Sequence, residues 1–406
     1  MTFTHHFGLI RSRRMELGGT AAICVVASMI GVLFAGSTVP TPLYVIYKQQ
    51  FGFSQISLTL IYAAYVVGNL AALLLFGRLS DEIGRRRSAV AAMAVAILSA
   101  LTFLFAHSIV SLYAARILSG LAIGIGAGTA TAWLAELIAE QDKSRATVIA
   151  TSANFAGLGI GALISGVLAD YVSSPLQLPF IVYLLVLVPV STLVWLTHET
   201  VSRPVENIKR MSMRPRLSVP SEIRAQFVAP AVTGFGAMAL VGFYAALEPS
   251  LLAEHLHAAS HAAAGTVFLE LALVVSATIV ATRSLSSRAA MLWALGLMLP
   301  SVALLVSAQI VGSMAIMIVA TTLCGITTGL GYRGSLQVVN QIAPENRRAE
   351  VVSSYFVCGF SGNALPVIGV GVISTLASST AASLVFAATI SVFALVALFF
   401  GIKYRQ

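Results

Sequence analysis

Long apolar runs separated by short charged loops constrain this chain more than any other feature of its sequence. A helix needs about 20 apolar residues to cross a hydrocarbon core about 30 Å thick, and each run is long enough. Because lipid offers no partner to exposed backbone groups, we expect every run to be a helix. The sequence predicts an all-α integral membrane protein with spans at about 19–47, 56–76, 88–106, 110–139, 146–170, 178–197, 227–252, 262–282, 289–307, 311–340, 351–375 and 379–402.

The composition agrees with a membrane protein and argues against several other classes. Hydrophobic residues make up 58% of the 406 residues and charged residues 10%, whereas soluble domains carry about 25% charged residues. The net charge of +9 is spread over loops between the apolar runs, so we expect no nucleic-acid partner. The cysteines Cys24, Cys324 and Cys358 lie inside apolar runs without metal-ligand spacing, so neither a metal site nor a disulfide framework is expected.

The distribution of basic residues predicts the orientation of the chain in the membrane. Of 24 Lys and Arg residues, Lys48 lies in an outer loop and Arg116 and Arg333 lie within spans, if the N-terminus is inside. The remaining 21 (24 minus three) then lie on the cytoplasmic side, as the positive-inside rule requires. The first run follows Arg11, Arg13 and Arg14 but is too long for a signal peptide. We therefore expect a multi-pass protein of the plasma (inner) membrane with both termini in the cytoplasm.

The loop from Gly77 to Arg87 is tight, glycine-bounded and rich in arginine. One interpretation is a loop that only orients the protein. Its residue order resembles the signature loop of the major facilitator superfamily, between that family's second and third helices. The resemblance implies two six-helix halves, and a loop that latches the halves together on the cytoplasmic side when the transporter opens outward. The matching residues are Gly77, Leu79, Asp81, Gly84, Arg85 and Arg86, and we expect Glu136 to pair with Arg85 or Arg86.

The domain organisation follows from the longest break between runs. It predicts a cytoplasmic tail at 1–18, a six-helix bundle at 19–197, a linker at 198–226 and a second six-helix bundle at 227–402. The linker is either a solvated tether or a short amphipathic helix on the inner leaflet. A shift of 205 residues superposes glycines of the two halves, including Gly120 on Gly325 and Gly157 on Gly362, which indicates an internal repeat.

Charged residues inside spans are costly and usually functional. Four lie there, namely Arg116, Glu248, Glu270 and Arg333. Glu270 is surrounded by apolar neighbours, and burial favours the neutral form of a carboxylate, which suits a proton carrier. The alternatives are a static ion pair between Glu270 and Arg333 and an interfacial position for Glu248. Arg116 matches the family's fourth-span motif, which implies a role in proton transfer or substrate charge; otherwise it bonds backbone carbonyls.

Several other residues are candidates for contact with substrate or for helix packing. Pro40 and Pro42 predict a kink at the outer end of the first span. The glycines of the fifth span partly match the motif of the family's antiporters, and they also suit close packing of helices. The substrate-cavity candidates are Tyr62, Tyr65, Asn69, Asn154 and Tyr244, and the fifth-span glycines are Gly157, Gly161 and Gly166.

The function that these patterns favour is secondary active transport. We expect proton-coupled efflux of small amphipathic molecules by alternating access, in a monomeric antiporter-like protein without cofactors that is not an enzyme. One alternative is a proton-coupled symporter that imports a small organic anion, with Arg116 and Arg333 as its ligands. Another is a non-transporting receptor on the same fold.

Overall fold

The computed structural model describes residues 16–77, 79–138, 143–201, 217–256 and 260–404. In these residues the chain is helical apart from turns, 3-10 turns and one isolated bridge between Leu17 and Thr197. Within the described part of the chain, twelve helices are long and apolar enough to cross a membrane. The predicted all-α fold with twelve spans is therefore confirmed.

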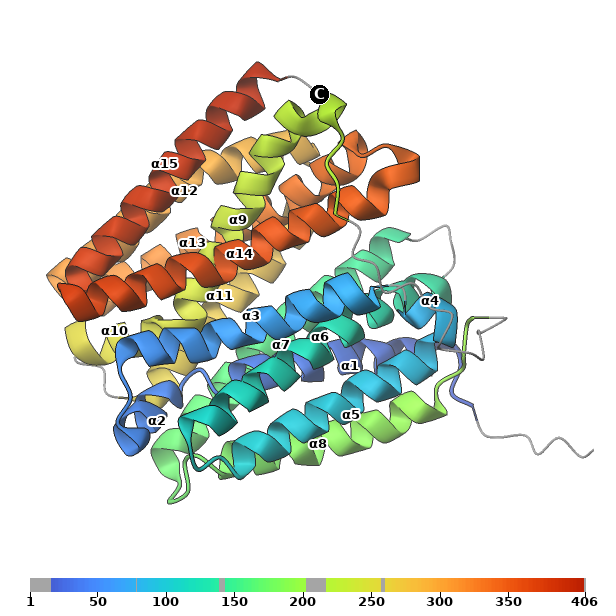
Figure 1. Cartoon of the computed structure of the whole chain (residues 1–406), viewed down its shortest axis with the longest axis horizontal. Coiled ribbons are helices and arrows are strands. Elements are labelled where there is room, and N and C mark those ends of the chain that lie inside the picture. The colour runs from blue at the N-terminus through green and yellow to red at the C-terminus, as the bar shows by residue number, and fades with distance from the viewer. Residues whose placement is uncertain (1–15, 78, 139–142, 202–216, 257–259, 405–406) are drawn as a thin grey trace, which may run out of the picture.

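The helices form two bundles, which follow one another along the chain (Figure 1). The predicted boundaries agree with the structure to within a few residues for most spans. The first bundle contains α1 (Gly19–Thr38), α2 (Tyr44–Phe51), α3 (Gln55–Phe76), α4 (Leu79–Ile83), α5 (Arg85–Leu104), α6 (Ile109–Leu137), α7 (Lys143–Tyr171) and α8 (Leu178–Leu196). The second contains α9 (Arg224–Ala246), α10 (Glu248–His255), α11 (His261–Ala281), α12 (Ser287–Val311), α13 (Met314–Ile342), α14 (Arg348–Leu376) and α15 (Ser379–Lys403).

The first span of each bundle is broken. The break in the first bundle lies at Pro40 and Pro42, where a kink was predicted, and the break in the second corrects the continuous span predicted at 227–252. Helix α1 ends at Thr38 and α2 begins at Tyr44, with Pro40 and Pro42 in the turns between them. Helix α9 ends at Ala246, and α10 begins at Glu248 with proline in its first turn. Proline has no N–H to donate and its ring clashes with the preceding turn, which favours a break at these prolines. Pro230, in contrast, lies inside α9 without breaking it.

The ends of the helices lie at two faces of the molecule. We call the end that carries α4 and the start of α5 the arginine-rich face, and the end that carries α2 and α10 the opposite face (Figure 1). The backbone N–H of Leu17 donates to the carbonyl oxygen of Leu196, at the end of α8, and its own carbonyl oxygen accepts from the N–H of His198. Arg288 donates to the carbonyl oxygen of Gly401 near the end of α15. The start of the first span and the end of the last span therefore both lie at the arginine-rich face, as the even number of spans predicts.

Glycines let neighbouring helices of each bundle approach to backbone contact. A Cβ added to Gly157 in α7 would lie 2.1 Å from the carbonyl oxygen of Gly31 in α1. A Cβ on Gly362 in α14 would lie 2.2 Å from the carbonyl oxygen of Phe235 in α9. These two glycines are the pair that the 205-residue shift superposes, so the repeat in sequence corresponds to a repeated helix contact.

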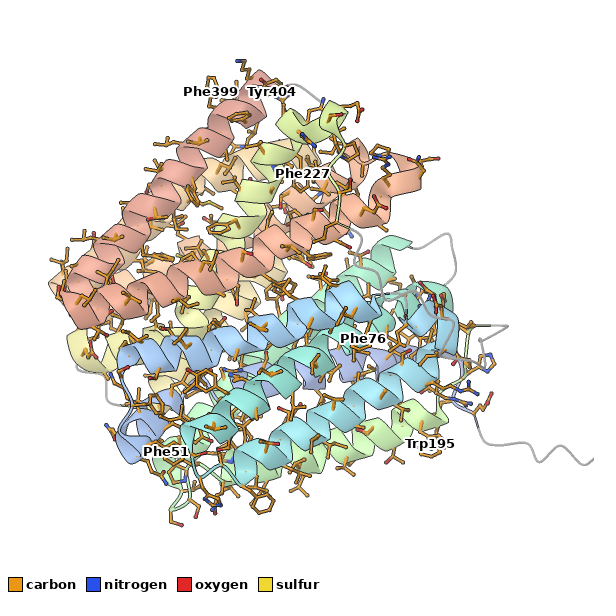
Figure 2. The ribbon with its side chains drawn as sticks, in the orientation of Figure 1. Phe51, Phe76, Trp195, Phe227, Phe399 and Tyr404 are labelled. Carbon is orange, nitrogen blue, oxygen red and sulfur yellow. The ribbon has the colours of Figure 1, made fainter. Side chains whose placement is uncertain are left out.

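Large apolar side chains cover the outside of both bundles (Figure 2). Trp195 on α8 is 61% exposed and Phe399 on α15 is 59% exposed. In the most apolar stretch of each of these helices, 28% of the residues are buried. In the corresponding stretch of the span at Ser221–Ala246, 72% of the residues are buried. Helices α8 and α15 therefore belong to the outer, lipid-facing layer of the molecule.

Candidate transport site

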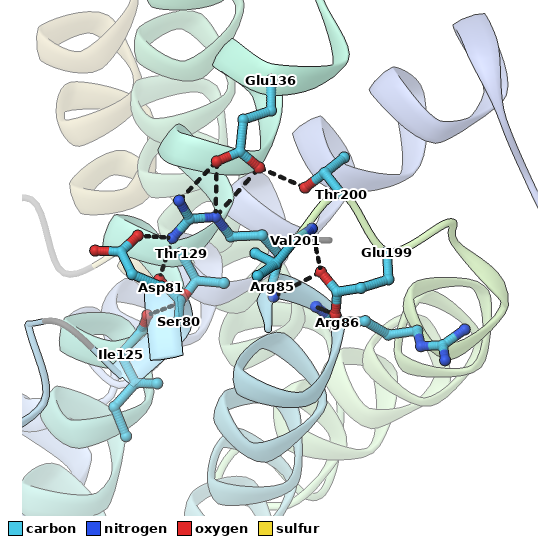
Figure 3. Close-up of polar contacts among 10 residues, drawn as sticks. All are labelled: Ser80, Asp81, Arg85, Arg86, Ile125, Thr129, Glu136, Glu199, Thr200 and Val201. Atoms are coloured by element: carbon cyan, nitrogen blue, oxygen red, sulfur yellow. Dashed lines mark hydrogen bonds and ion pairs between the residues drawn. The ribbon is translucent and has the colours of Figure 1, made fainter. Parts of the chain in front are cut away.

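The arginine-rich face of the first bundle holds a compact polar cluster around Arg85 (Figure 3). The Arg85 guanidinium lies 2.6 Å from Glu136 Oε1 and 2.5 Å from Asp81 Oδ1, and it donates to Ser80 Oγ at 2.6 Å. The predicted contact of Glu136 with the loop arginines is thus confirmed for Arg85. Arg86 turns instead to Glu16, at 3.3 Å.

Glu199, which sequence reasoning missed, caps the helix that Arg85 begins. Its carboxylate accepts from the backbone N–H groups of Arg85 and Arg86, at 2.9 and 3.0 Å. Negative charge is favourable at a helix N-terminus, where these N–H groups lack helical partners. Gly84, with a φ of 102°, brings the chain so close that a Cβ there would lie 2.5 Å from Glu199 Oε2. The described partner of Asp81 in this structure is Arg85.

At the opposite face the carboxylate of Asp170 joins the two bundles. Asp170, near the end of α7, accepts from the hydroxyl of Ser260 at 2.6 Å and from the backbone N–H groups of His261 and Ala262 at 2.9 Å each. The His261 imidazole Nδ1 lies 2.8 Å from the same carboxylate. Asp170 therefore caps the first turn of α11 from the other bundle.

A second polar contact between the bundles lies further inside, between α3 and α14. The hydroxyl of Tyr62 donates to Asn363 Oδ1 at 2.8 Å, and both side chains are buried. Tyr65 and Asn69 bond to each other along α3, at 3.3 Å. Of these three predicted cavity residues, Tyr62 contacts the second bundle in this conformation. Tyr65 and Asn69 form a hydrogen bond with each other instead.

Arg116 is fully buried at the break between α1 and α2. It donates to the carbonyl oxygen of Ser37 at 2.6 Å and to the hydroxyl of Tyr44, and its guanidinium carbon lies 5.2 Å from the centre of the Tyr44 ring. Ser37 is in the last turn of α1, where helix carbonyls lack partners, so the break in the first span creates an acceptor for Arg116. Its Nε has no partner among the described residues.

Glu248 is the counterpart of this arrangement at the break in the second bundle. It is fully buried at the first residue of α10, and neither of its carboxylate oxygens has a hydrogen-bond partner among the described residues. The Glu248 side chain is therefore enclosed by protein and not exposed to solvent. Tyr244, one turn earlier in the chain, is also buried and bonds to Thr321 at 3.1 Å.

Glu270 lies near the middle of α11, and Arg333 lies elsewhere. Thr322 of α13 donates to Glu270 Oε1 at 2.7 Å. Arg333 donates to the carbonyl oxygens of Arg283 and Leu285 at 2.9 and 2.8 Å, in the loop that follows α11. The alternative of a static Glu270–Arg333 ion pair is therefore wrong for this conformation, because loop carbonyls take the place of the carboxylate.

The remaining candidates lie along α7. Asn154 has a buried side-chain oxygen without a partner among the described residues. Gly161 packs on α1, where a Cβ would lie 2.4 Å from the carbonyl oxygen of Ala35. Gly166 faces α11, where a Cβ would lie 2.3 Å from the carbonyl oxygen of His261. The fifth-span glycines thus pack α7 against both its own bundle and the other one. Over the described residues, no group of three or more His, Cys, Asp or Glu side chains has the arrangement of a metal site.

Comparison with known proteins gives one family and one fold. The family model described as Major Facilitator Superfamily matches residues 26–367. The human organic anion transporter MFSD10 (TETRAN) aligns with a TM-score of 0.67 and 16% identity, over 94% of this chain and 99% of that one. A bacterial homologue of the human lysosomal transporter Spinster, inward-facing and unoccupied, aligns with a TM-score of 0.71 and 14% identity, over 95% and 98%. A search of curated protein sequences found no match.

Proposed function

Because this chain belongs to the major facilitator superfamily, we propose that it is a secondary transporter that exports small amphipathic molecules in exchange for protons. The fold, with two six-helix bundles and neighbours that are transporters, is consistent with secondary transport. Substrate would be carried by alternating access, in which the bundles rock around a site between them.

We place the arginine-rich face in the cytoplasm and the protein in the inner membrane as a monomer. The excess of Lys and Arg at this face supports the orientation through the positive-inside rule. The described hydrogen bonds between the bundles, at Asp170 and at Tyr62, lie toward the opposite face. With this orientation, the conformation is closed to the outside and corresponds to an inward-facing state.

The observation that carries the proton-coupling proposal is the environment of Glu270. This carboxylate lies mid-span with one described hydrogen bond, from Thr322, and no cation beside it among the residues that the structure describes. A carboxylate without a counter-ion in an apolar span changes its protonation more easily than one held in an ion pair. Protonation in one conformation and release in the other would couple the proton gradient to transport.

The test replaces Glu270 by its neutral isostere. Glu270→Gln should abolish accumulation of a lipophilic dye driven by a proton gradient in proteoliposomes, while gradient-free exchange of the same dye continues. Glu254→Gln, which removes an exposed carboxylate from α10, is the matched control and should behave as wild type. If Glu270→Gln concentrates dye as well as wild type, proton coupling through Glu270 is wrong and Glu248 becomes the better candidate.

A second function, proton-coupled uptake of a small organic anion, is favoured by Arg116. This cation is completely buried and has no ion-pair partner among the described residues, and its Nε lacks an acceptor. A carboxylate ligand would supply both the missing negative charge and an acceptor for the Nε hydrogen. The similarity to an organic anion transporter agrees with this candidate. The same proteoliposomes distinguish the two, because acid outside drives labelled benzoate inward in a symporter and drives dye outward in an exporter; a receptor would show neither flux.

A further inference from the structure

A basic pocket opens at the arginine-rich face of the second bundle, outside the contacts between the bundles. It has a volume of about 680 Å³ and lies between the start of α12, the end of α13 and the loop that joins α11 to α12. Three arginines line it together with neutral polar side chains, among them Arg283, Arg288, Arg333, Ser286, Gln337 and Gln341. Its described lining contains no carboxylate.

Two of these arginines are fixed in place and retain unused donors. Arg333 directs Nη2 at two loop carbonyls, and its buried Nη1 has no partner among the described residues. Arg288 directs Nη2 at the carbonyl oxygen of Gly401, 2.8 Å away, and its buried Nε likewise has no described partner. Buried donors without acceptors cost free energy, so this arrangement favours a ligand that accepts hydrogen bonds.

The corresponding region of the first bundle shows what the pocket lacks. There Arg85, in the first turn of α5, is neutralised by Asp81 and by Glu136 at the end of α6. The 205-residue shift places Gln341 where the first bundle has Glu136. In the same contact between the third and fourth spans, Gln341 Nε2 lies 3.5 Å from the Ser287 hydroxyl, which also bonds to Gln337 at 2.9 Å. A neutral pair thus replaces the acid–arginine pair, and the surrounding arginines keep their charge.

We propose that this pocket binds a phosphate-bearing anion. Guanidinium groups donate paired hydrogen bonds that match the oxygens of a phosphate, and three positive charges without a described carboxylate favour an anion. With the orientation proposed above, the pocket lies at the inner leaflet, where basic pockets between spans bind lipid phosphates. The ligand is either the headgroup of an anionic phospholipid or a soluble phosphate ester, since both present the same group.

The test measures binding to the purified full chain in detergent, without any transport assay. The probes are phosphatidylglycerol, phosphatidylcholine and soluble glycerol phosphate, and native mass spectrometry counts the bound molecules. Wild type should bind phosphatidylglycerol in preference to phosphatidylcholine. Competition by glycerol phosphate would show that the phosphate alone suffices, and its absence would identify the lipid as the source.

The variant Gln341→Glu restores the acid of the first bundle and leaves all three arginines in place. It should weaken binding of phosphatidylglycerol about tenfold, because an added carboxylate repels the anion and occupies arginine donors. Asn340→Asp adds the same charge to the neighbouring exposed residue of α13, outside the pocket lining, and should bind like wild type. Equal weakening by both variants, or no preference of wild type for either phosphate anion over phosphatidylcholine, would overturn the proposal.

Discussion

The two faces of the molecule use their carboxylates in opposite ways. At the opposite face Asp170 of the first bundle bonds to the start of α11 in the second bundle. At the arginine-rich face Asp81, Glu136 and Glu199 bond to Arg85 and Arg86 within the same bundle. Carboxylates therefore join the bundles at one end and hold a single bundle together at the other.

This difference separates contacts that exist in only one conformation from contacts that hold one bundle together as a rigid body. Contacts between bundles must break when the protein opens at that face, so they set the balance between conformations. Contacts inside a bundle persist in both conformations and leave the balance nearly unchanged. Three substitutions test this division, in descending order of expected effect. In each, spin-label distances between the bundles are measured with labels at His107 and Ala377 on the opposite face, and at Ala135 and Asn340 on the arginine-rich face.

Asp170→Ala should have the largest effect. It removes a charged cap that accepts hydrogen bonds from α11, and hydrogen bonds to charged groups contribute about 1.5–3 kcal/mol each. A net loss of about 2 kcal/mol would shift the balance about 30-fold toward opening at the opposite face. The distance between labels at His107 and Ala377 should lengthen. Ser173→Ala, an exposed change just after α7, is the control, and unchanged distances in Asp170→Ala would show that it does not hold the face closed.

Tyr62→Phe should shift the same distance less. It removes one neutral hydrogen bond to Asn363, for which about 1 kcal/mol, or about fivefold in population, is expected. Tyr65→Phe is a matched control, because the Tyr65 hydroxyl bonds to Asn69 on its own helix. The comparison fails if the two variants move the labels equally.

Asp81→Asn should affect this conformation least. Asp81 is 58% exposed and Arg85 keeps Glu136, so losing this pair should change the free energy of the present conformation little. The conformation closed at the arginine-rich face should lose about 0.3–1 kcal/mol if Asp81 caps a helix there. We expect slower turnover with normal expression, and label distances at the arginine-rich face biased toward the open state. Turnover equal to that of Glu82→Gln, the neighbouring control, would reduce the loop to a topology signal.

The fold was largely predictable because lipid restricts a spanning chain to helices. Hydropathy located the twelve spans, and prolines located the break at Pro40 and Pro42. The break before Pro249 was missed, because the apolar run continues through Glu248 and hydropathy averages over such a residue. The helices were therefore predicted well where hydropathy or a pair of prolines determines where a helix begins and ends.

The site was predicted less completely, because its contacts join residues far apart in sequence. Glu136 was expected beside the loop arginines, since its position at the inner end of a span limits its reach. Asp170 and Glu199 were missed because each caps a helix that lies many residues away in the chain. The alternative that paired Arg333 with Glu270 was wrong, because the loop carbonyls that Arg333 contacts carry no signal in the sequence. The roles of Glu270, Arg116 and Glu248 remain predictions.

The glycine contacts of α7 have a consequence for how sequences with this fold diverge. Where Gly157 and Gly166 meet Gly31 and His261, the touching atoms on the far side are backbone atoms, which every residue type shares. Such a contact restricts the size of a side chain and requires no particular partner. Mutations can therefore accumulate on both helices as long as these few positions stay small. Solved transporters that share only 14–16% of their residues with this chain still align over 94–95% of its length.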